Sequence, residues 1–558
     1  MGSKIMIRIW QKSSKDRGVA LLTVTIIMMM VAMLGLAYIT LTSTNLLRAG
    51  RDERRTTAFY LAEAGLEYII DQMMTQGTIT TVTYDTSTTL DSLCSSATGS
   101  VVVTADSGGK SGTLTSSATY RGITERVRVR LKLKNIGTWN NAIFAGIGAS
   151  GRGINGNVDI RGSVHILGDG EPYSDLNGNG QRDTAEAYTD SNSNGSYDAG
   201  EPFTDTDGDE VWSSTEPFQD NDLDGVYDVP LTAADLVTEI TGNANVGNNY
   251  NGMPDDLRAK IPSLVRQSFG GEMVDTLDAE VRVKHGKVNI DGNGNIGELN
   301  ETGNTLKETM DGCFVTDGYT GNKGASSVYS DNGTSQKYDL GDRMSFPSLD
   351  DEYTDSATSI HYDHFHDYLE ANSLEITDIT KIDNTVASFT RSSGSNSIAW
   401  NQGTGTLTIS GIVRFHNNTS NRLDLGAIGT TINYTGRGTI YTQHGTVYVH
   451  GNILPTTVFP TTDVMGVIAG LDIEFATGPG EAQLSGAGAW FAQRTIKSAK
   501  QNKFAGTYVA NYFDMGTNVP SIYQVPELVN HMPPGMPGGE IVVVTQTVSW
   551  RHLSQSGG

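Results

Sequence analysis

The sequence predicts an α+β protein, predominantly β, in which one long N-terminal helix precedes a small antiparallel sheet and a large β-rich domain. Three observations predict this fold. A charge-free run at residues 19–41 continues as a spaced apolar pattern, residues 125–134 alternate strictly between apolar and polar, and short strand-like runs separated by Gly and Asn follow from residue 141. The 65 glycines against 15 prolines agree with many tight turns, because Gly reaches positive φ without a steric penalty.

The long helix is predicted over residues 19–76. Residues 4–17 carry five Lys or Arg against one Asp, and the run from Val19 to Leu41 carries no charge. Such a run is long enough, as a helix, to cross about 30 Å of hydrocarbon. The basic residues before it place the N-terminus in the cytoplasm, so we expect the rest of the chain to be exported. Spaced apolar residues without proline then continue the helix to residue 76.

Two motifs lie on this helical stretch, RGVALL at residues 17–22 and AFYLAEAGLE at residues 58–67. With the basic leader, they resemble a class III prepilin and, more narrowly, the PilX N-terminal family of type IV minor pilins. The resemblance implies that residues 1–18 are a leader, which a prepilin peptidase cuts between Gly18 and Val19. It also implies that the helix packs against other pilin subunits. The chain would then lie in the inner membrane, crossing it once, before it joins an extracellular filament.

The sequence departs from this resemblance at one position. Major pilins carry Glu as the fifth residue after the cut, where this chain has Thr23. In the family, that Glu offsets the N-terminal amine of a neighbouring subunit inside the apolar filament core, where an unpaired charge is costly. A subunit without it suits the filament tip. Two alternatives are a plain membrane anchor without a filament and a pseudopilin of type II secretion, because the K pseudopilins share the first motif.

A pilin-like antiparallel sheet is predicted over residues 77–135. Runs rich in Thr and Val lead to residues 125–134, where Val127, Val129, Leu131 and Leu133 are expected on one buried face.

The segment at residues 171–231 is acidic and repetitive. Between Glu171 and Asp228 there are sixteen Asp or Glu against one Arg, which gives −15 of the total charge of −24. Four units recur every fifteen residues, with oxygen ligands at alternate positions; three have a turn glycine and three a closing Glu. A twelve-residue loop of this kind supplies the ligands that Ca²⁺ prefers. The predicted ligands are Asp175, Asn177, Asn179, Asp183, Glu186, Asp190, Asn192, Asn194, Asp198, Glu201, Asp205, Asp207, Asp209, Glu216, Asp220, Asp222, Asp224 and Asp228.

A period of fifteen residues leaves no room for helices between the loops. We therefore expect a stack of loops that is similar to dockerin or thrombospondin type 3 repeats. Ca²⁺ would be structural there, because the carboxylates repel one another without it. The alternative is an acidic linker without a fixed structure. The same acidity argues against a nucleic-acid partner, whose phosphates favour Lys and Arg.

The outer domain is predicted over residues 136–558, and it includes the acidic loops. Its short runs with Gly and Asn between them favour an irregular parallel β-helix, with a β-sandwich second. Helical breaks are expected at residues 232–240, 254–260 and 364–373. The two cysteines, Cys94 and Cys313, either form a disulfide or stay as free thiols.

The sequence contains no nucleophile elbow, zincin helix or P-loop, and no dinucleotide fingerprint that leads from a strand into a helix, so we predict that the chain is not an enzyme. The run HYDHFHD holds His361, His364 and His366, but their order does not match a zinc hydrolase, and a solvated helix is favoured over a metal site. The alternative is a carbohydrate-active enzyme on a β-helix, with carboxylates such as Asp472 and Glu474 in a groove. The leading function is a minor-pilin-like tip subunit that displays a calcium-stabilised domain, with adhesion to a surface or carbohydrate as a further role.

Overall fold

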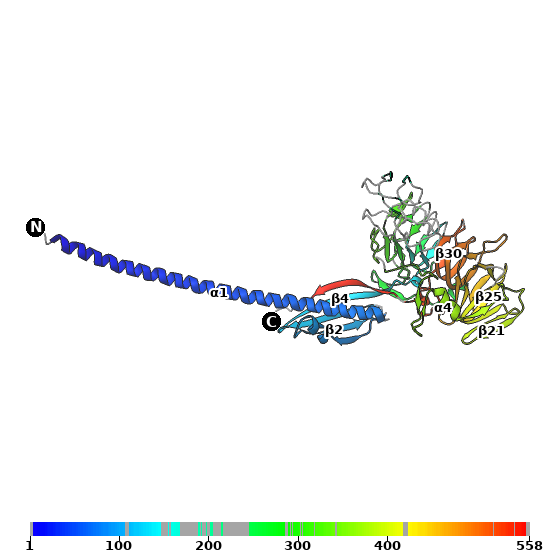
Figure 1. Ribbon diagram of the computed structural model, residues 1–558, viewed down its shortest axis with the longest axis horizontal. Coiled ribbons are helices and arrows are strands. Elements are labelled where there is room, and N and C mark those ends of the chain that lie inside the picture. The colour runs from blue at the N-terminus through cyan, green and yellow to red at the C-terminus, as the bar shows by residue number, and fades with distance from the viewer. Residues whose placement is uncertain are drawn as a thin grey trace. The chain divides into compact units, whose positions relative to one another are not determined.

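The computed structural model shows two compact units, drawn as ribbons in Figure 1. Unit 1 consists of Met1–Ile136 and Val542–Gly558, and unit 2 consists of Gly137–Ile541. The structure describes residues 4–76, 78–106, 111–146, 154–155, 158–167, 188–189, 191, 197, 201–204, 212, 214–215, 245–284, 288–290, 292, 294–301, 303, 305–316, 318–340, 343–416, 422–516, 518–540 and 542–553.

Unit 1 is built on helix α1 (Lys4–Gln76), which ends at the predicted residue but begins inside the predicted leader. Every side chain from Leu21 to Ala49 is exposed. From Ala58 onward one side of the helix is buried, at a spacing of three or four residues that keeps the buried residues on one face. These buried residues are Ala58, Leu61, Ala62, Leu66, Ile69 and Met73. The helix therefore has an exposed half and a half that packs within unit 1.

The packed half of α1 lies on a five-stranded antiparallel sheet with the order β1-β2-β3-β4-β33. The predicted face of residues 125–134 is confirmed, since Val127, Val129, Leu131 and Leu133 are buried. Between β3 and β4, Arg121 and Gly122 both have positive φ, as a two-residue hairpin turn requires. The elements are β1 (Val82–Asp85), α2 (Ser87–Leu93), β2 (Thr98–Ala105), β3 (Ser111–Tyr120), β4 (Ile123–Asn135) and β33 (Val543–His552).

Strand β33 corrects the predicted boundary of the outer domain, 136–558. It pairs antiparallel with β4, from Val543 opposite Asn135 to His552 opposite Val127, and therefore belongs to unit 1 (Figure 1, red beside cyan). The sequence pattern could not reveal this, because the partner is distant and a bulge after Thr547 breaks the alternation. Unit 2 is thus inserted between two neighbouring strands of unit 1.

Unit 2 consists mainly of short strands that pair in parallel along three ladders, one coil of chain upon the next. The first ladder runs through β19 (Ser373–Ile376), β23 (Thr406–Phe415), β25 (Thr431–Thr442), β28 (Val464–Ala469), β30 (Ser485–Ser498), β31 (Lys503–Asp514), β5 (Ile143–Ala145), β8 (Val164–Ile166), β12 (Glu280–Val283) and β15 (Gly312–Val315). The second runs through β20 (Lys381–Ile382), β24 (Arg422–Leu425), β26 (Thr446–Val449), β29 (Ile473–Phe475), β30, β31 and β6 (Ile154–Asn155). The third runs through β23, β25, β27 (Asn452–Pro455), β30, β31, β32 (Ser521–Tyr523), β7 (Asp159–Arg161), β9 (Asn245–Gly247) and β14 (Asn295–Ile296).

Parallel ladders favour the predicted β-helix over the predicted sandwich, whose two sheets would be antiparallel. The helical breaks expected at 254–260 and 364–373 contain α3 and α4, and the one expected at 232–240 lies outside the described residues. The remaining elements are η1 (Thr138–Asn140), α3 (Asp255–Arg258), β10 (Arg266–Phe269), β11 (Glu272–Asp275), β13 (Val288–Asn289), β16 (Tyr319–Thr320), η4 (Gly324–Ser327), β17 (Tyr353–Thr354), β18 (His361–Tyr362), α4 (Phe365–Ala371), β21 (Phe389–Ser393), β22 (Asn396–Asn401) and η5 (Pro526–Asn530).

The coils of unit 2 do not stack in sequence order. The stack begins with β19 and follows the sequence order as far as β31. The next strand in the stack is β5, the first strand of unit 2. Both ends of unit 2 therefore meet within the stack. Trp139 Nε1 donates to the carbonyl of Pro537 at 2.7 Å, and Thr507 Oγ1 donates to the carbonyl of Asn141 at 2.7 Å. An insertion between adjacent strands of unit 1 needs ends that lie side by side, and this order of coils supplies them.

Aromatic rings from all three ladders fill the interior around Phe475. Its ring centroid lies 4.9 Å from Trp490, 4.5 Å from Phe504 and 5.3 Å from Tyr508. At the corners, Asn side chains bind the neighbouring coil. The amide oxygens of Asn452 and Asn502 accept the backbone N–H of Ser485 and of Leu484, each at 2.8 Å. These bonds give the Asn-rich corners a structural role, because buried backbone N–H groups need partners.

The return segment, described at residues 336–340 and 343–372, connects the coil of β15 to the coil of β19. It covers the outer side of the first ladder, where Phe346 stacks on Phe491 with ring centroids 5.7 Å apart. The ladder neighbours of Phe491 on this side are Ile468 and Val509, and all three are fully buried. Around Phe491 the first ladder is therefore buried on both sides.

Candidate functional sites

The first candidate site is the exposed half of α1. Its large apolar side chains point to all sides of the helix, with exposed fractions from 46% at Ile26 to 73% at Leu21. Three of its threonine hydroxyls bond back to the helix itself. Thr25 donates to the carbonyl of Leu21 and Thr40 to that of Leu36, each at 2.8 Å, so these groups do not depend on water. By length and composition, α1 can cross a membrane.

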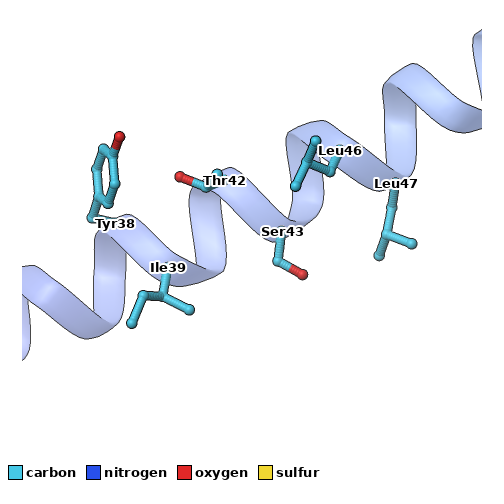
Figure 2. Close-up of a pocket in the computed structure, with 6 residues that line it drawn as sticks. All are labelled: Tyr38, Ile39, Thr42, Ser43, Leu46 and Leu47. Atoms are coloured by element: carbon cyan, nitrogen blue, oxygen red, sulfur yellow. The ribbon is translucent and has the colours of Figure 1, made fainter.

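A shallow depression lies near the end of this apolar half. Figure 2 shows that its lining comes from α1 alone, with side chains on both sides of the helix. A single helix cannot enclose a small molecule, so the depression belongs to the same apolar surface. Its lining residues are Tyr38, Ile39, Thr42, Ser43, Leu46 and Leu47.

The predicted processing residues Gly18 and Val19 lie inside α1, so the bond between them is helical in the uncut chain. Thr23 follows on the exposed half. The cut itself stays a prediction.

A buried carboxylate fixes α1 to the sheet of unit 1. Glu125, at the start of β4, is 4% exposed. It accepts a hydrogen bond from Arg55 Nε at 2.6 Å and bonds to His552 Nε2 at 2.7 Å. The His552 ring also meets Phe59 edge-on, at 4.9 Å between centroids. The Glu125 side chain thus connects α1, β4 and β33. It fixes the position of α1 on the sheet at Arg55.

The second candidate site is the acidic repeat. Among its predicted ligands the structure describes Glu201, which is 8% exposed and accepts the backbone N–H of Ser191 at 2.7 Å. The backbone N–H of Thr189 donates to the carbonyl of Pro202 at 2.8 Å, which brings the two ends of the second predicted loop together. The other predicted ligands lie outside the described residues: Asp175, Asn177, Asn179, Asp183, Glu186, Asp190, Asn192, Asn194, Asp198, Asp205, Asp207, Asp209, Glu216, Asp220, Asp222, Asp224 and Asp228.

The donor set of the second loop fits Ca²⁺ chemically, because carboxylate and amide oxygens are its preferred ligands. Its closing Glu201 is buried where the loop ends meet. Within the described residues, no group of three or more His, Cys, Asp or Glu could hold a metal ion. The Ca²⁺ sites therefore stay a prediction from the sequence. Sequence reasoning also missed four aromatic side chains in this segment, which contact one another: Tyr188, Tyr197, Phe203 and Trp212.

The histidine run does not form one cluster. His361 lies on β18 and bonds to Thr354 Oγ1 at 3.2 Å, outside the predicted helix. His364 and His366 stack at 4.9 Å. Their Nδ1 atoms bond to the backbone carbonyls of Asp350 and Leu349, at 2.9 and 3.2 Å. The bond to Asp350 raises the pKa of His364. A nitrogen that donates to a carbonyl is not free to bind a metal.

The carboxylates considered for catalysis are both paired with cations of the next coil. Asp472 accepts a bond from Arg494 at 2.8 Å, and Glu474 accepts bonds from Lys497 at 3.2 Å and from Thr477 at 2.7 Å. Carboxylates held in this way stabilise the ladder. They do not form the unpaired acid and base of a glycoside hydrolase.

The two cysteines are free thiols, Cys94 in unit 1 and Cys313 in unit 2. Burial raises the pKa of Cys313 to about 12, which makes this thiol a poor nucleophile.

A comparison with protein-family models finds no match for this chain, and a comparison with curated proteins finds none either. Among solved structures, the chain is similar to the crystal structure of the competence-associated pilin ComZ from Thermus thermophilus. The TM-score is 0.46 at 16% identity, and the match covers 90% of this chain and 97% of that chain. So low an identity transfers no function, and the function below is inferred from the residues of this chain.

Proposed function

We propose that this chain is a subunit of a type IV pilus or a related filament, of the minor-pilin type that its PilX-like motifs suggest. The observation that carries the proposal is the division of α1. One half is apolar on all sides and exposed, and the other half packs in unit 1. Burying one large apolar side chain contributes about 1.5–3 kcal/mol. The exposed half therefore needs an apolar environment, which lipid supplies before assembly and the helices of other subunits supply afterwards.

The position that we propose in the filament is the tip. Thr23 cannot offset a neighbour's N-terminal amine as a Glu would, so a subunit ahead of this one would leave that amine buried without a partner. A subunit with no neighbour ahead of it avoids that cost. Unit 2, inserted between β4 and β33, would then be the part displayed to the surroundings, with a surface or carbohydrate ligand as its partner.

We further propose that Ca²⁺ stabilises the displayed part at the acidic repeat. The support is the fourfold recurrence of loop positions in the sequence and the buried Glu201 where the second loop closes. When bound, Ca²⁺ would neutralise part of the −15 charge of this segment. Affinities of about 10⁻⁴–10⁻³ M are typical of extracellular Ca²⁺ modules.

The test is N-terminal sequencing and immunoblotting of this protein in sheared surface filaments, with and without the prepilin peptidase. A mature chain that starts at Val19, and that is lost without the peptidase, is the expected result. Gly18→Asp should block the cut. Gly35→Ala is the matched control in the same helix, because an added Cβ at Gly35 meets no atom within 4 Å. An uncut chain that stays in the membrane fraction would overturn the filament function and leave a membrane-anchored surface protein.

A further inference from the structure

Two aromatic positions recur through the acidic repeat with the same period of fifteen residues as its acidic positions. The first series lies two positions after each of the three closing Glu residues, at Tyr188, Phe203 and Phe218, and Tyr173 continues it fifteen residues earlier. The second lies seven positions after the first Asp of a unit: Tyr197, Trp212 and Tyr227. Neither position supplies an oxygen ligand to the predicted loops, so Ca²⁺ binding alone does not account for them.

The members that the structure describes contact one another across three consecutive units. Tyr197 stacks on Trp212 with centroids 4.6 Å apart and planes at 16°. Tyr188 meets both rings edge-on, at 5.7 Å from Tyr197 and 5.8 Å from Trp212. Phe203 meets Tyr197 edge-on at 5.9 Å. The described members of the two series thus form one aromatic core, defined here as Tyr188, Tyr197, Phe203 and Trp212.

This aromatic core lies where the second loop begins and ends. Tyr188 forms a β-bridge with Phe203, beside the hydrogen bond from Thr189 to Pro202. The same closure holds Glu201, whose carboxylate accepts the N–H of Ser191 at 2.7 Å. The ring contacts and the position of the predicted closing ligand therefore depend on one local geometry.

We propose that the aromatic core couples consecutive Ca²⁺ loops, so that ion binding at one loop favours binding at the next. The inference rests on the Ca²⁺ role proposed above. A twelve-residue loop is too small to bury a core of its own. The contact between Tyr197 and Trp212 joins two units and is complete only when both are ordered. An ion that orders one unit therefore prepares its neighbour, and the effect is reciprocal.

The experiment is a Ca²⁺ titration of the full chain in detergent, followed by calorimetry and by tryptophan fluorescence. The wild-type chain should bind with a Hill coefficient above one. The chain has six tryptophans, so subtracting the trace of Trp212→Phe, which keeps an aromatic ring, isolates the signal of Trp212. That signal should change with Ca²⁺ occupancy.

Tyr197→Ala removes the ring that joins the two units and leaves every predicted ligand in place. We expect the same number of bound ions, a Hill coefficient near one and a half-saturating Ca²⁺ concentration that is roughly fivefold to tenfold higher. Tyr448→Ala, which removes an aromatic residue on the second ladder, is the control and should titrate like the wild type.

The outcomes separate the two ideas. Non-cooperative binding in the wild type, or unchanged cooperativity in Tyr197→Ala, would overturn the coupling and leave the Ca²⁺ role intact. A chain that binds no Ca²⁺ at millimolar concentration would overturn both. A Trp212 fluorescence signal that does not change with Ca²⁺, in a wild-type chain that still binds Ca²⁺ cooperatively, would also count against the aromatic core as the coupling element.

Discussion

The first and second ladders of unit 2 are built from the same kind of short parallel strand, but their outward side chains differ. On the first ladder these side chains are apolar or paired, and the return segment covers most of them. On the second ladder they are partly exposed and mostly charged: Lys381, Asp424, Tyr448, Glu474, Lys497 and Asp514, in register from coil to coil. A parallel ladder therefore does not require burial on both sides. The outward residues decide whether a segment packs on it.

The largest expected effect is at the centre of the covered ladder. Phe491→Ala removes a fully buried ring that stacks on Phe346, and it should lower the free energy of unfolding of unit 2 by about 3–5 kcal/mol. Calorimetric unfolding of the whole chain would measure it. A loss below about 1 kcal/mol would mean that the return segment does not depend on this contact.

The next effect concerns the ion pairs that hold the return segment. Arg282, 6% exposed on β12, pairs with Glu280 on its own strand and with Asp339 in the return segment at 2.9 Å. Arg282→Met leaves Glu280 buried without a cation, so we expect a loss of about 3 kcal/mol. The double variant Arg282→Met with Glu280→Gln should recover part of it. Equal losses in the single and double variants would contradict the explanation.

A smaller effect should depend on pH. His165 is buried beside Tyr338, 2.7 Å from its hydroxyl, and burial together with Arg282 lowers its pKa well below the usual value. In the unfolded chain His165 is protonated near pH 6.5, whereas in the folded chain it stays neutral. The free energy of unfolding should therefore fall as the pH drops below about 6.5. Between about pH 7 and 5.5 the wild type should lose roughly 1 kcal/mol more than His165→Gln. Parallel curves for the two proteins would exclude this origin.

The smallest effect is expected on the open ladder. Lys497 pairs with Glu474 at 3.2 Å and is partly exposed. Lys497→Met should change the stability by no more than about 1 kcal/mol, because solvent screens the pair. A loss as large as that of Arg282→Met would remove the distinction between the two ladders.

The spacing of apolar residues in the sequence correctly predicted α1 and β4, whose patterns can be recognised within a short stretch of chain. Helix α1 ends at the predicted Gln76, and the alternation at residues 125–134 gave the buried face of β4. The fifth strand of unit 1 was missed because its partner β4 is far away in the sequence, and nothing near Val543 indicates Asn135 as its partner. The order of coils in unit 2 was missed for the same reason.

The acidic repeat shows a different limit. Its period was visible in the sequence, but the search was for oxygen ligands, so the aromatic positions with the same period, such as Tyr197 and Trp212, were overlooked. In the histidine run, spacing alone could not show that His361 lies on a strand while His364 and His366 stack.

The meeting of both ends of unit 2 has a mechanical consequence. A pull between α1 and anything held by unit 2 must pass through two connections, at Ile136 and at Val542, which a hydrogen bond of 2.8 Å already joins. The two connections therefore share the tension. Because the load enters within the stack of coils, the terminal coils at β19 and β15 are not the points from which unit 2 would be unwound.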